Sequence, residues 1–364
     1  MKKYKKIKFY AFRDNKGATG GPGGVLYLQK NLIGDNLNGI ECRYYFREKK
    51  ELSKNFYKGA FLKVFFKELL SFNNYYICNE IGTAFALACL NRKYSLIYHQ
   101  QGPIIEELTN FGNKLGKIYK KLLHFIEKKA FINAQTLHFP SKGAEKMYFN
   151  SDFRSCNIQD VNIGKVLPNT IEIKEYEPRI EQTPNKITML CVGTLTKAKG
   201  QDITLNFIGN LLQKSNKKFR LIMVGSGPLE KELIKKGQEL EKNHLNFEFI
   251  YRKSLPHEEI MRLHKISDIY IMLHRISIFD LATLEAMSAG NAIVLSNVGG
   301  NIDFNIDENI ILVENEKDEV AIDKILNANI DFLKNKNLEI FNNYFSAECF
   351  SKNYKKVLEE LIQS

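Results

Sequence analysis

The chain has 364 residues, of which 44% are apolar and 26% charged, and it contains no apolar run of the roughly 20 residues that a membrane span requires. At roughly 150 residues per domain, this length predicts two domains with a cleft between them. The formal net charge of +12 is compatible with nucleic acid, an anionic membrane or phosphorylated substrates, but no RNA- or DNA-binding motif accompanies it, which argues against nucleic acid.

The N-terminus joins a short lysine-rich segment to an apolar run at 7–12. That run is too short for a signal-peptide core and has no cleavage site, so we expect a cytoplasmic protein that begins with a strand. Five glycines follow at positions 17, 20, 21, 23 and 24, and Val25, Leu28 and Leu32 then recur at helical spacing. A glycine-rich turn before a helix lets backbone N–H groups approach an anion or a sugar, although a merely flexible loop has the same composition.

The rest of the N-terminal half alternates between short apolar runs and helical patterns. Strands are predicted at 41–46, 75–78, 96–99, 136–139 and 166–167, and helices at 60–70, 83–90 and 141–148. This alternation is typical of a parallel sheet with covering helices.

A basic amphipathic helix is predicted at 111–130. Its apolar face comprises Leu115, Ile118, Tyr119, Leu122, Leu123 and Ile126, and its lysines are Lys114, Lys117, Lys120, Lys121, Lys128 and Lys129. Such a helix packs on a core with a solvated lysine face, or lies on an anionic membrane, and both roles are compatible. The segment 47–67, with six further lysines, could extend the same basic surface.

The segment 170–184 is polar, holds two prolines and has no periodicity, so it predicts an interdomain linker. A second and clearer alternation follows, which predicts a doubly wound α/β domain. Its strands are predicted at 187–192, 221–224, 247–251, 269–273, 292–295 and 310–313, and a last helix at 348–361.

The segment 277–290 is the most informative one in the chain. Asp280 is placed to cap a helix N-terminus, and Gly290 to end that helix. Glu285 lies among apolar residues of this helix, where a carboxylate is costly unless something hydrogen-bonds to it. We expect that partner to be a ligand.

Glycines and lysines follow the other strands of this domain at their carboxyl ends, where an open parallel sheet binds its ligands. They include Gly193, Lys197 and Lys199 after the first strand, Gly225 and Gly227 after the second, and Gly299 and Gly300 after the fifth. Open backbone donors together with a lysine suit a phosphate-bearing ligand.

Four motifs in this order carry a resemblance to a known family. They are Val-Gly-x-Leu-x-x-x-Lys-Gly at 192–200, Val-Gly-Ser-Gly-Pro at 224–228, Leu-Glu-Ala-Met-Ser-Ala-Gly at 284–290 and Gly-Gly-x-x-Asp at 299–303. The chain resembles the retaining glycosyltransferases of family four, which have the GT-B fold, and the resemblance covers nearly its whole length. It implies two Rossmann-like doubly wound domains facing a cleft, at 1–172 and 186–345, joined by a linker at 173–185. A helix at 346–364 would cross back to the first domain.

The resemblance also implies roles for individual residues. His99 would contact the sugar or the reacting centre, Lys199 would neutralise the diphosphate, and Glu285 would accept the ribose hydroxyls. The expected catalytic residues are His99, Lys199 and Asp280. The expected donor-binding residues are Gly23, Gly24, Gly193, Thr194, Lys199, Gly225, Ser277, Phe279, Leu281 and Glu285. The donor would be a nucleotide sugar, with UDP taken from family frequency, the acceptor a glycan or glycolipid at the inner membrane face, and neither metal nor cofactor is expected.

The chain departs from the family pattern at four positions, one of which is Ile278 in place of the first glycine of Glu-Gly-Phe-Gly. Ser277 replaces the usual first glutamate, Thr194 replaces an arginine, and Asp280 replaces the last glycine of Glu-Gly-Phe-Gly. Asp280 is either an ordinary N-cap or a displaced sugar-contacting carboxylate, and Arg275 could supply the missing positive charge. These departures leave a second hypothesis open, a non-catalytic GT-B partner or glycan-binding subunit.

Overall fold

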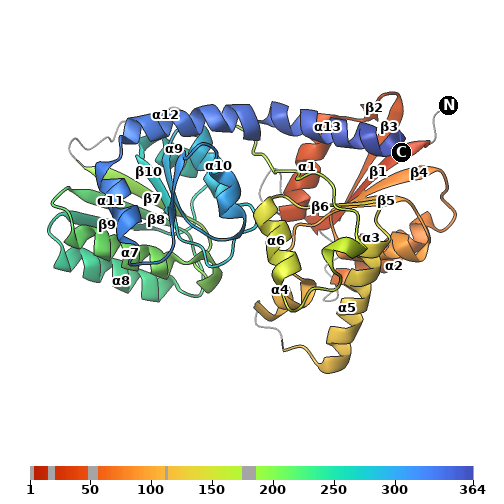
Figure 1. Cartoon of the computed structure of the whole chain (residues 1–364), viewed down its shortest axis with the longest axis horizontal. Helices are drawn as coiled ribbons and strands as arrows, with labels where there is room; N and C mark the ends of the chain where they lie inside the picture. Colours follow the sequence, from red (N-terminus) through yellow and green to blue (C-terminus); the bar gives the residue numbers. More distant parts are fainter. Residues whose placement is uncertain (1–3, 15–20, 48–55, 111–113, 174–185, 364) are drawn as a thin grey trace. The chain divides into compact units, whose positions relative to one another are not determined.

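The computed structural model describes residues 4–14, 21–47, 56–110, 114–173 and 186–363 (Figure 1). The chain divides into two compact units. The first comprises Met1–Glu172 and Ala347–Ser364, and the second Ile173–Ser346. The predicted linker at 173–185 lies, apart from Ile173, outside the described residues.

The first unit is built on a sheet whose strands, as far as the chain is described, run in the order β2-β3-β1-β4-β5-β6. These strands are β1 (Lys6–Asp14), β2 (Asn36–Leu37), β3 (Ile40–Arg47), β4 (Asn74–Cys78), β5 (Tyr94–Ile97) and β6 (Thr136–His138). All neighbours pair in parallel except β2, which is antiparallel to β3. The strand predicted at 166–167 is wrong: that segment is irregular, although the Leu167 N–H still donates to Phe139 O over 2.9 Å.

The helices of the first unit are α1 (Gly21–Ile33), α2 (Phe56–Glu68), α3 (Ile81–Cys89), α4 (Ile104–Asn110), α5 (Lys117–Ile132), α6 (Lys142–Asn150) and α13 (Ala347–Gln363). From β1 the chain moves one way to β3, and from β4 the other way to β5. Right-handed crossovers therefore place α1 and α3 on opposite faces of the sheet. The C-terminal helix α13 packs on α1, and Phe350 and Tyr354 enter the core that contains Phe9 and Leu26.

The second unit has an all-parallel sheet in the described residues, ordered β12-β11-β10-β7-β8-β9. Its strands are β7 (Ile187–Val192), β8 (Phe219–Val224), β9 (Phe247–Arg252), β10 (Ile269–Met272), β11 (Ala292–Ser296) and β12 (Ile310–Val313). The side chains of β7, β8, β10 and β11 are almost all buried, as expected for strands covered on both faces, whereas those of the edge strand β9 are only partly buried. The strand order reverses between β7 and β10, which is where a doubly wound sheet opens a crevice for its ligand.

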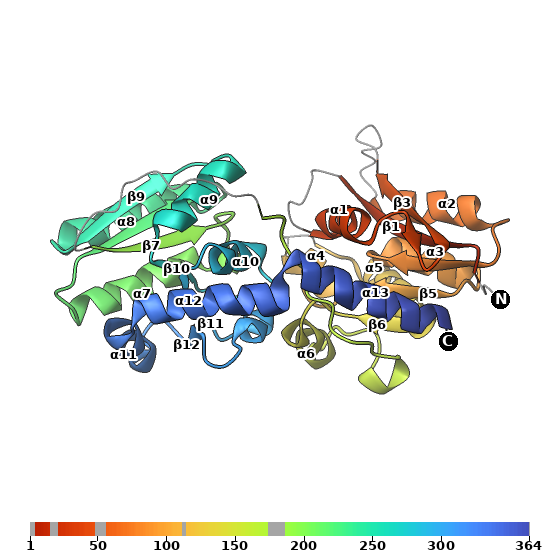
Figure 2. The same ribbon diagram turned by 90° about the horizontal axis from the view of Figure 1, so that it is seen from above.

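The helices of the second unit are α7 (Gln201–Gln213), α8 (Glu230–Asn243), α9 (His257–Ile266), α10 (Leu281–Ser288), α11 (Glu319–Asn327) and α12 (Ile330–Ile340). Figure 1 shows α7 and α8 on one side of the sheet and α9, α10 and α12 on the other. Figure 2 shows α12 lying over β11 with α10 beside it, and both helices contact that strand. None of the helices described in either unit is long and apolar enough to cross a bilayer.

Candidate active site

Two turns meet at the carboxyl edge of the second sheet, one after β7 and one after β10. Gly200 closes the first turn with a φ of 69°, and a Cβ on it would lie 1.9 Å from Leu273 O, so only glycine allows this approach. The Arg275 N–H donates to Ala198 O over 2.9 Å and fastens the turns to each other. Lys199 is thereby held beside the segment that leads into α10.

Lys199 ends in a compact polar cluster with Asp280 and His274. Its Nζ lies 2.7 Å from Asp280 Oδ1 and 3.4 Å from His274 Nε2, and His274 Nε2 lies 3.6 Å from the same Asp280 oxygen. The Asp280 side chain is 8% exposed and that of His274 1%, whereas Lys199 keeps 28%. The lysine is therefore the member of the cluster that solvent reaches most easily.

Burial and charge act in opposite directions on Asp280. Burial alone would raise the pKa of the Asp280 carboxyl, but the Lys199 charge and the contact with His274 hold that pKa well below its usual range. Burial lowers the pKa of the His274 imidazole. At neutral pH Asp280 is accordingly ionised and His274 is neutral.

The prediction that Asp280 caps a helix is confirmed. Asp280 Oδ2 accepts hydrogen bonds from the Thr283 N–H and the Thr283 hydroxyl, each over 3.1 Å, and from the Tyr270 hydroxyl over 3.2 Å. At the other end of α10 the predicted terminator Gly290 has a φ of 75°. The N-terminus of α10 therefore points its dipole at the Lys199 cluster, and Leu281 is its first residue.

Glu285 has a protein partner that its sequence context did not predict. Its Oε1 lies 2.9 Å from His257 Nε2, and its side chain is 16% exposed rather than enclosed by apolar residues. A ligand is therefore not needed to satisfy this oxygen, and ribose binding by Glu285 stays a prediction. His257 is the first residue of α9, a helix that contacts α10, and its proximity to Glu285 follows from the tertiary packing of the two helices.

Arg275, which could supply the missing positive charge, is engaged in an internal salt bridge. Its guanidinium contacts both Asp202 oxygens over 2.6 and 2.8 Å, and Lys197 Nζ lies 2.9 Å from the same carboxylate. These hydrogen bonds outweigh burial and hold the pKa of Asp202 well below its usual value. The three cations at this edge are therefore paired with carboxylates of the same unit: Arg275 and Lys197 with Asp202, and Lys199 with Asp280.

Ser277 and Phe279 are buried and precede the cap. The Ser277 hydroxyl has no hydrogen-bond partner in the described part of the chain. The centroid of the Phe279 ring lies 4.5 Å from that of Phe304 and 5.8 Å from that of Phe345, so this side chain belongs to the core. Only the backbone of Phe279 is left to contact a nucleotide-sugar donor. Around the β7 and β8 turns, a Cβ on Gly225 would lie 1.9 Å from Gly193 O, and Thr194 is exposed.

The other predicted site residues lie in the first unit. His99 is buried two residues after β5, and Gly24 is buried in the first turn of α1, which also contains Gly23. The loop that carries His99 is held by Glu127 of α5, whose Oε1 accepts from the Tyr98 hydroxyl over 2.7 Å and from the Ile104 N–H over 2.9 Å. Sequence reasoning missed Glu127, because its partners come from three separate segments.

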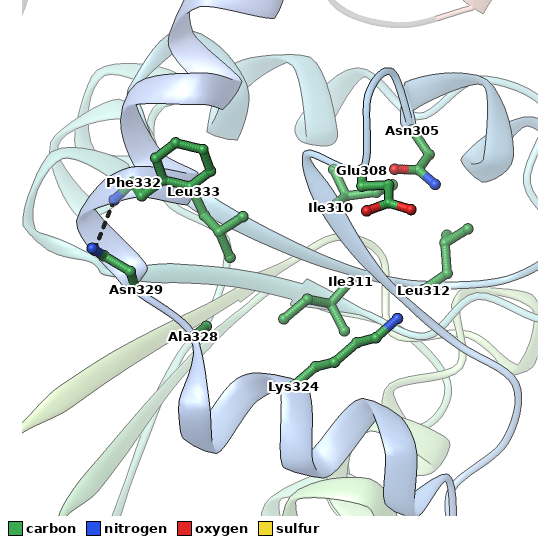
Figure 3. Close-up of a pocket in the computed structure, with 10 residues that line it drawn as sticks. All are labelled: Asn305, Glu308, Ile310, Ile311, Leu312, Lys324, Ala328, Asn329, Phe332 and Leu333. Atoms are coloured by element: carbon green, nitrogen blue, oxygen red, sulfur yellow. Dashed lines mark hydrogen bonds between the residues drawn. The ribbon is translucent and has the colours of Figure 1, made fainter.

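Two pockets mark the β10–β12 side of the second unit. One, of about 550 Å³, is lined by His274 and Arg275 together with residues after β11 and β12. The other, of about 370 Å³, lies between β12, α11 and α12, where Asn329 caps α12 by accepting from the Phe332 N–H over 3.0 Å (Figure 3). None of the predicted site residues lines this second pocket.

In the described residues no group of three or more His, Cys, Asp or Glu side chains is placed to hold a metal ion.

Comparison with known proteins shows similarity to glycosyltransferases. Residues 172–343 match the family model of the glycosyl transferases group 1. The chain is a glycosyltransferase. It is 27% identical over 308 residues to an uncharacterized glycosyltransferase of Methanocaldococcus jannaschii, an alignment that covers 82% of this chain and 76% of the relative. Over 146 residues it is also 27% identical to the GPI3 subunit of phosphatidylinositol N-acetylglucosaminyltransferase of Saccharomyces cerevisiae, covering 38% of this chain and 31% of that subunit.

The glycosyltransferase also shares its fold with solved structures. Anabaena HepE in complex with UDP superimposes with a TM-score of 0.64 at 13% identity, covering 98% of this chain and all of that one. A likeness at this identity establishes the fold alone. The predicted GT-B architecture, two parallel-sheet α/β domains with a C-terminal helix, is confirmed.

Proposed function

We propose that the protein is a retaining glycosyltransferase that moves a sugar from a nucleotide diphosphate, with UDP as the first candidate, to a hydroxyl group of a lipid-linked or surface glycan. It would act in the cytoplasm at the inner face of the membrane, where the 111–130 segment contacts anionic lipid. The UDP complex of a protein with the same fold supports the choice of nucleotide.

One observation carries the proposal: Lys199, the N-terminus of α10 and Glu285 occupy one carboxyl edge of a parallel sheet, at the strand-order reversal. An ammonium group and a helix N-terminus stabilise the negative charge that develops on a departing diphosphate. Glu285, five residues after Asp280, lies about 7 Å further along the helix axis. It offers its second carboxylate oxygen to ribose hydroxyls while His257 holds the first.

The residues divide the chemistry between them. Lys199 binds the diphosphate, the Gly193 and Gly225 turns let backbone approach it, and His99 contacts the sugar or the reacting centre. The acceptor hydroxyl attacks from the face that the diphosphate leaves, and its proton passes to the leaving group, so that configuration is retained without a separate base. Because Lys199 and the helix dipole supply the positive charge, the proposal requires no metal ion and no cofactor.

A second candidate function is a non-catalytic subunit of a glycosylation complex. Ser277 and Thr194 stand where the family has a glutamate and an arginine at the donor site, and Asp280 forms a salt bridge with Lys199. A relative that is itself named as a subunit, GPI3, is consistent with this alternative. The retained Glu285, Lys199 and His99 favour the enzyme.

A panel of nucleotide sugars tests the two candidates. Thermal shift and donor hydrolysis are measured for the wild type and for Glu285→Ala, with Glu248→Ala as matched control, because Glu248 is a half-exposed, ion-paired carboxylate on β9. The enzyme reading expects Glu285→Ala to weaken binding roughly tenfold or more and to abolish hydrolysis, since a hydrogen bond to a charged group is lost. Binding without hydrolysis or transfer would favour the subunit, and indifference to every nucleotide would contradict both.

A further inference from the structure

The helix α5 exposes an apolar stripe to solvent instead of burying it. Its core-facing side chains are Leu123, Glu127, Ala130 and Phe131. Ile118, Leu122 and Phe125, spaced i, i+4 and i+7, lie on the opposite face, and Ile118 is 87% exposed. The predicted apolar face is therefore only partly a core face, because Ile118, Tyr119 and Leu122 point to solvent. Such a stripe on a surface helix indicates a partner.

The helix α2 repeats this arrangement. Leu62 and Phe66, followed by Leu69 just past its end, have the same i, i+4 and i+7 spacing, and Phe66 is 69% exposed. Leu70 and Phe72 extend the exposed apolar area. Two helices of one unit thus present equivalent apolar stripes.

A row of aromatic rings joins the two stripes across α3. The centroid of Phe85 on α3 lies 5.2 Å from that of Phe61 on α2 and 6.0 Å from that of Phe125 on α5. On α2 the row continues through Phe65 to Phe66, at 5.5 and 5.8 Å. Figure 1 shows α3 beside both helices, which it also contacts. The apolar stripes of α2 and α5 and the rings between them form one continuous surface, the α2–α5 face.

The charges on this face are of one sign. Lys117, Lys121 and Lys128 form a stripe next to the apolar stripe of α5, and Lys63 is exposed on α2. Lys67 lies on another side of α2, where its ammonium group is 3.5 Å from the centroid of the Tyr45 ring. Each helix has a single carboxylate, and both are buried: Glu68 binds Lys8 over 2.7 Å, and Glu127 holds the His99 loop. A partner that complements the face must be apolar within and negatively charged at its boundary.

We propose that the α2–α5 face docks on the surface of an anionic lipid bilayer. The apolar stripes enter the boundary between headgroups and acyl chains, while the long lysine side chains keep their ammonium groups at the level of the anionic headgroups. Each lysine near such a surface contributes roughly 1 kcal/mol of attraction, which salt weakens. The idea that this docking presents a lipid-linked acceptor rests on the proposed function. Binding of the protein to vesicles can be measured without any sugar transfer.

Vesicle sedimentation tests the docking with the full chain, using phosphatidylcholine vesicles and vesicles with about a third phosphatidylglycerol. We expect binding to the anionic vesicles alone, weakening as salt rises. Reversal of Lys117, Lys121 and Lys128 to glutamate is expected to reduce binding by roughly 100-fold or more. The matched control reverses Lys231, Lys235 and Lys242, three exposed lysines of α8 in the second unit, and leaves binding unchanged.

The apolar contribution is tested separately on each helix. Ile118→Ser with Leu122→Ser on α5, and Leu62→Ser with Phe66→Ser on α2, are each expected to weaken binding at least tenfold. Leu245→Ser, at an exposed leucine before β9, is the matched control. The proposal is overturned if the wild type binds neutral vesicles as tightly as anionic ones, or if a control variant loses as much binding as the α2 or α5 variants. It is also overturned if the α2 double variant keeps the wild-type melting temperature and binds the vesicles as tightly as the wild type. Vesicle binding without transfer leaves the docking standing and counts against the proposed transferase activity. Transfer without vesicle binding overturns the docking, and with it the proposed membrane contact, but leaves the transferase activity standing.

Discussion

Lys199 Nζ lies 2.7 Å from Asp280 Oδ1, so the lysine proposed to receive a diphosphate is already paired with a carboxylate of its own chain. That carboxylate also caps α10. A donor phosphate therefore has to compete with Asp280 for the lysine and to approach a helix N-terminus that carries a fixed negative charge. The Asp280 carboxylate is therefore expected to weaken donor binding while it stabilises α10.

Asp280→Asn separates these two effects. Asparagine caps a helix about as well as aspartate, so the helix keeps its N-cap while the competing charge is removed. We expect the variant to bind UDP roughly tenfold more tightly in isothermal titration calorimetry, because a like charge near the phosphates is gone. Its free energy of unfolding is expected to fall by roughly 1–3 kcal/mol, because the Lys199 charge loses its partner.

The matched control is Asp318→Asn, which changes the N-cap of α11 in the same unit. It is expected to leave UDP binding unchanged. Weaker UDP binding by Asp280→Asn would show that the carboxylate assists the donor. A loss of turnover with unchanged binding would instead identify Asp280 as a sugar contact.

His257 is expected to position Glu285 for the ribose. In His257→Ala the carboxylate loses the hydrogen bond that fixes its Oε1, and UDP affinity should fall roughly three- to tenfold. His257→Gln, which can still donate a hydrogen bond, should recover most of that loss. Steady-state kinetics should show a raised KM with kcat nearly unchanged, because the contact acts on ground state and transition state alike.

The control for this prediction is His244→Ala, which removes a histidine at the C-terminus of α8. It is expected to leave KM at the wild-type value. Equal UDP affinity in His257→Ala and wild type would mean that Glu285 needs no orienting partner. If His257→Gln did not restore the affinity lost in His257→Ala, the hydrogen bond to Glu285 would not be the cause of that loss.

The local features of this chain were predictable from sequence, and the long-range ones were not. The Asp280 cap, the Gly290 terminator and the bounds of β7 and β12 depend on residues within a few positions of one another. The pairing of Lys199 with Asp280 spans 81 positions, and that of Glu285 with His257 spans 28. Neither pairing leaves a periodic signal, because each arises only when neighbouring strands and helices align their ends.

The α5 helix shows a second limit of sequence reasoning. Its composition predicted an amphipathic helix, but both of its sides carry apolar residues, and periodicity alone does not say which side meets the core. Glu127 settles the matter in the structure, because its four hydrogen-bond donors turn it inward. A charged residue thus faces the core, and Ile118 and Phe125 face solvent.

Gly200→Ala tests whether the contact between the two turns holds the site together. Alanine at a φ of 69°, with its Cβ 1.9 Å from Leu273 O, cannot fit without moving the backbone, and we expect a loss of roughly 2–4 kcal/mol of unfolding free energy. Gly34→Ala is the control, because Gly34 has a φ of 82° but open space around its Cβ position, so it should lose only about 1 kcal/mol. Equal losses in chemical denaturation would show that backbone strain alone matters at Gly200.

The stability of the second unit is expected to fall between pH 7 and pH 5 because of buried histidines. His264 is fully buried, its Nδ1 lies 2.9 Å from Asn291 Oδ1, and burial lowers the pKa of its imidazole, as it does for His274. A folded-state pKa below the unfolded value of about 6.5 means that the unfolded state binds more protons. This stability is therefore fully present above about pH 6.5 and is lost as pH falls toward the lower folded-state pKa.

Each such histidine contributes a slope of at most about 1.4 kcal/mol per pH unit. The lowered pKa values of Asp280 and Asp202 have the same sign but act below about pH 4, so they do not enter this window. We expect His264→Gln to reduce the decline in unfolding free energy between pH 7 and pH 5, measured by urea titration at several pH values. A decline as steep as that of the wild type would show that His264 is protonated in the folded state without cost.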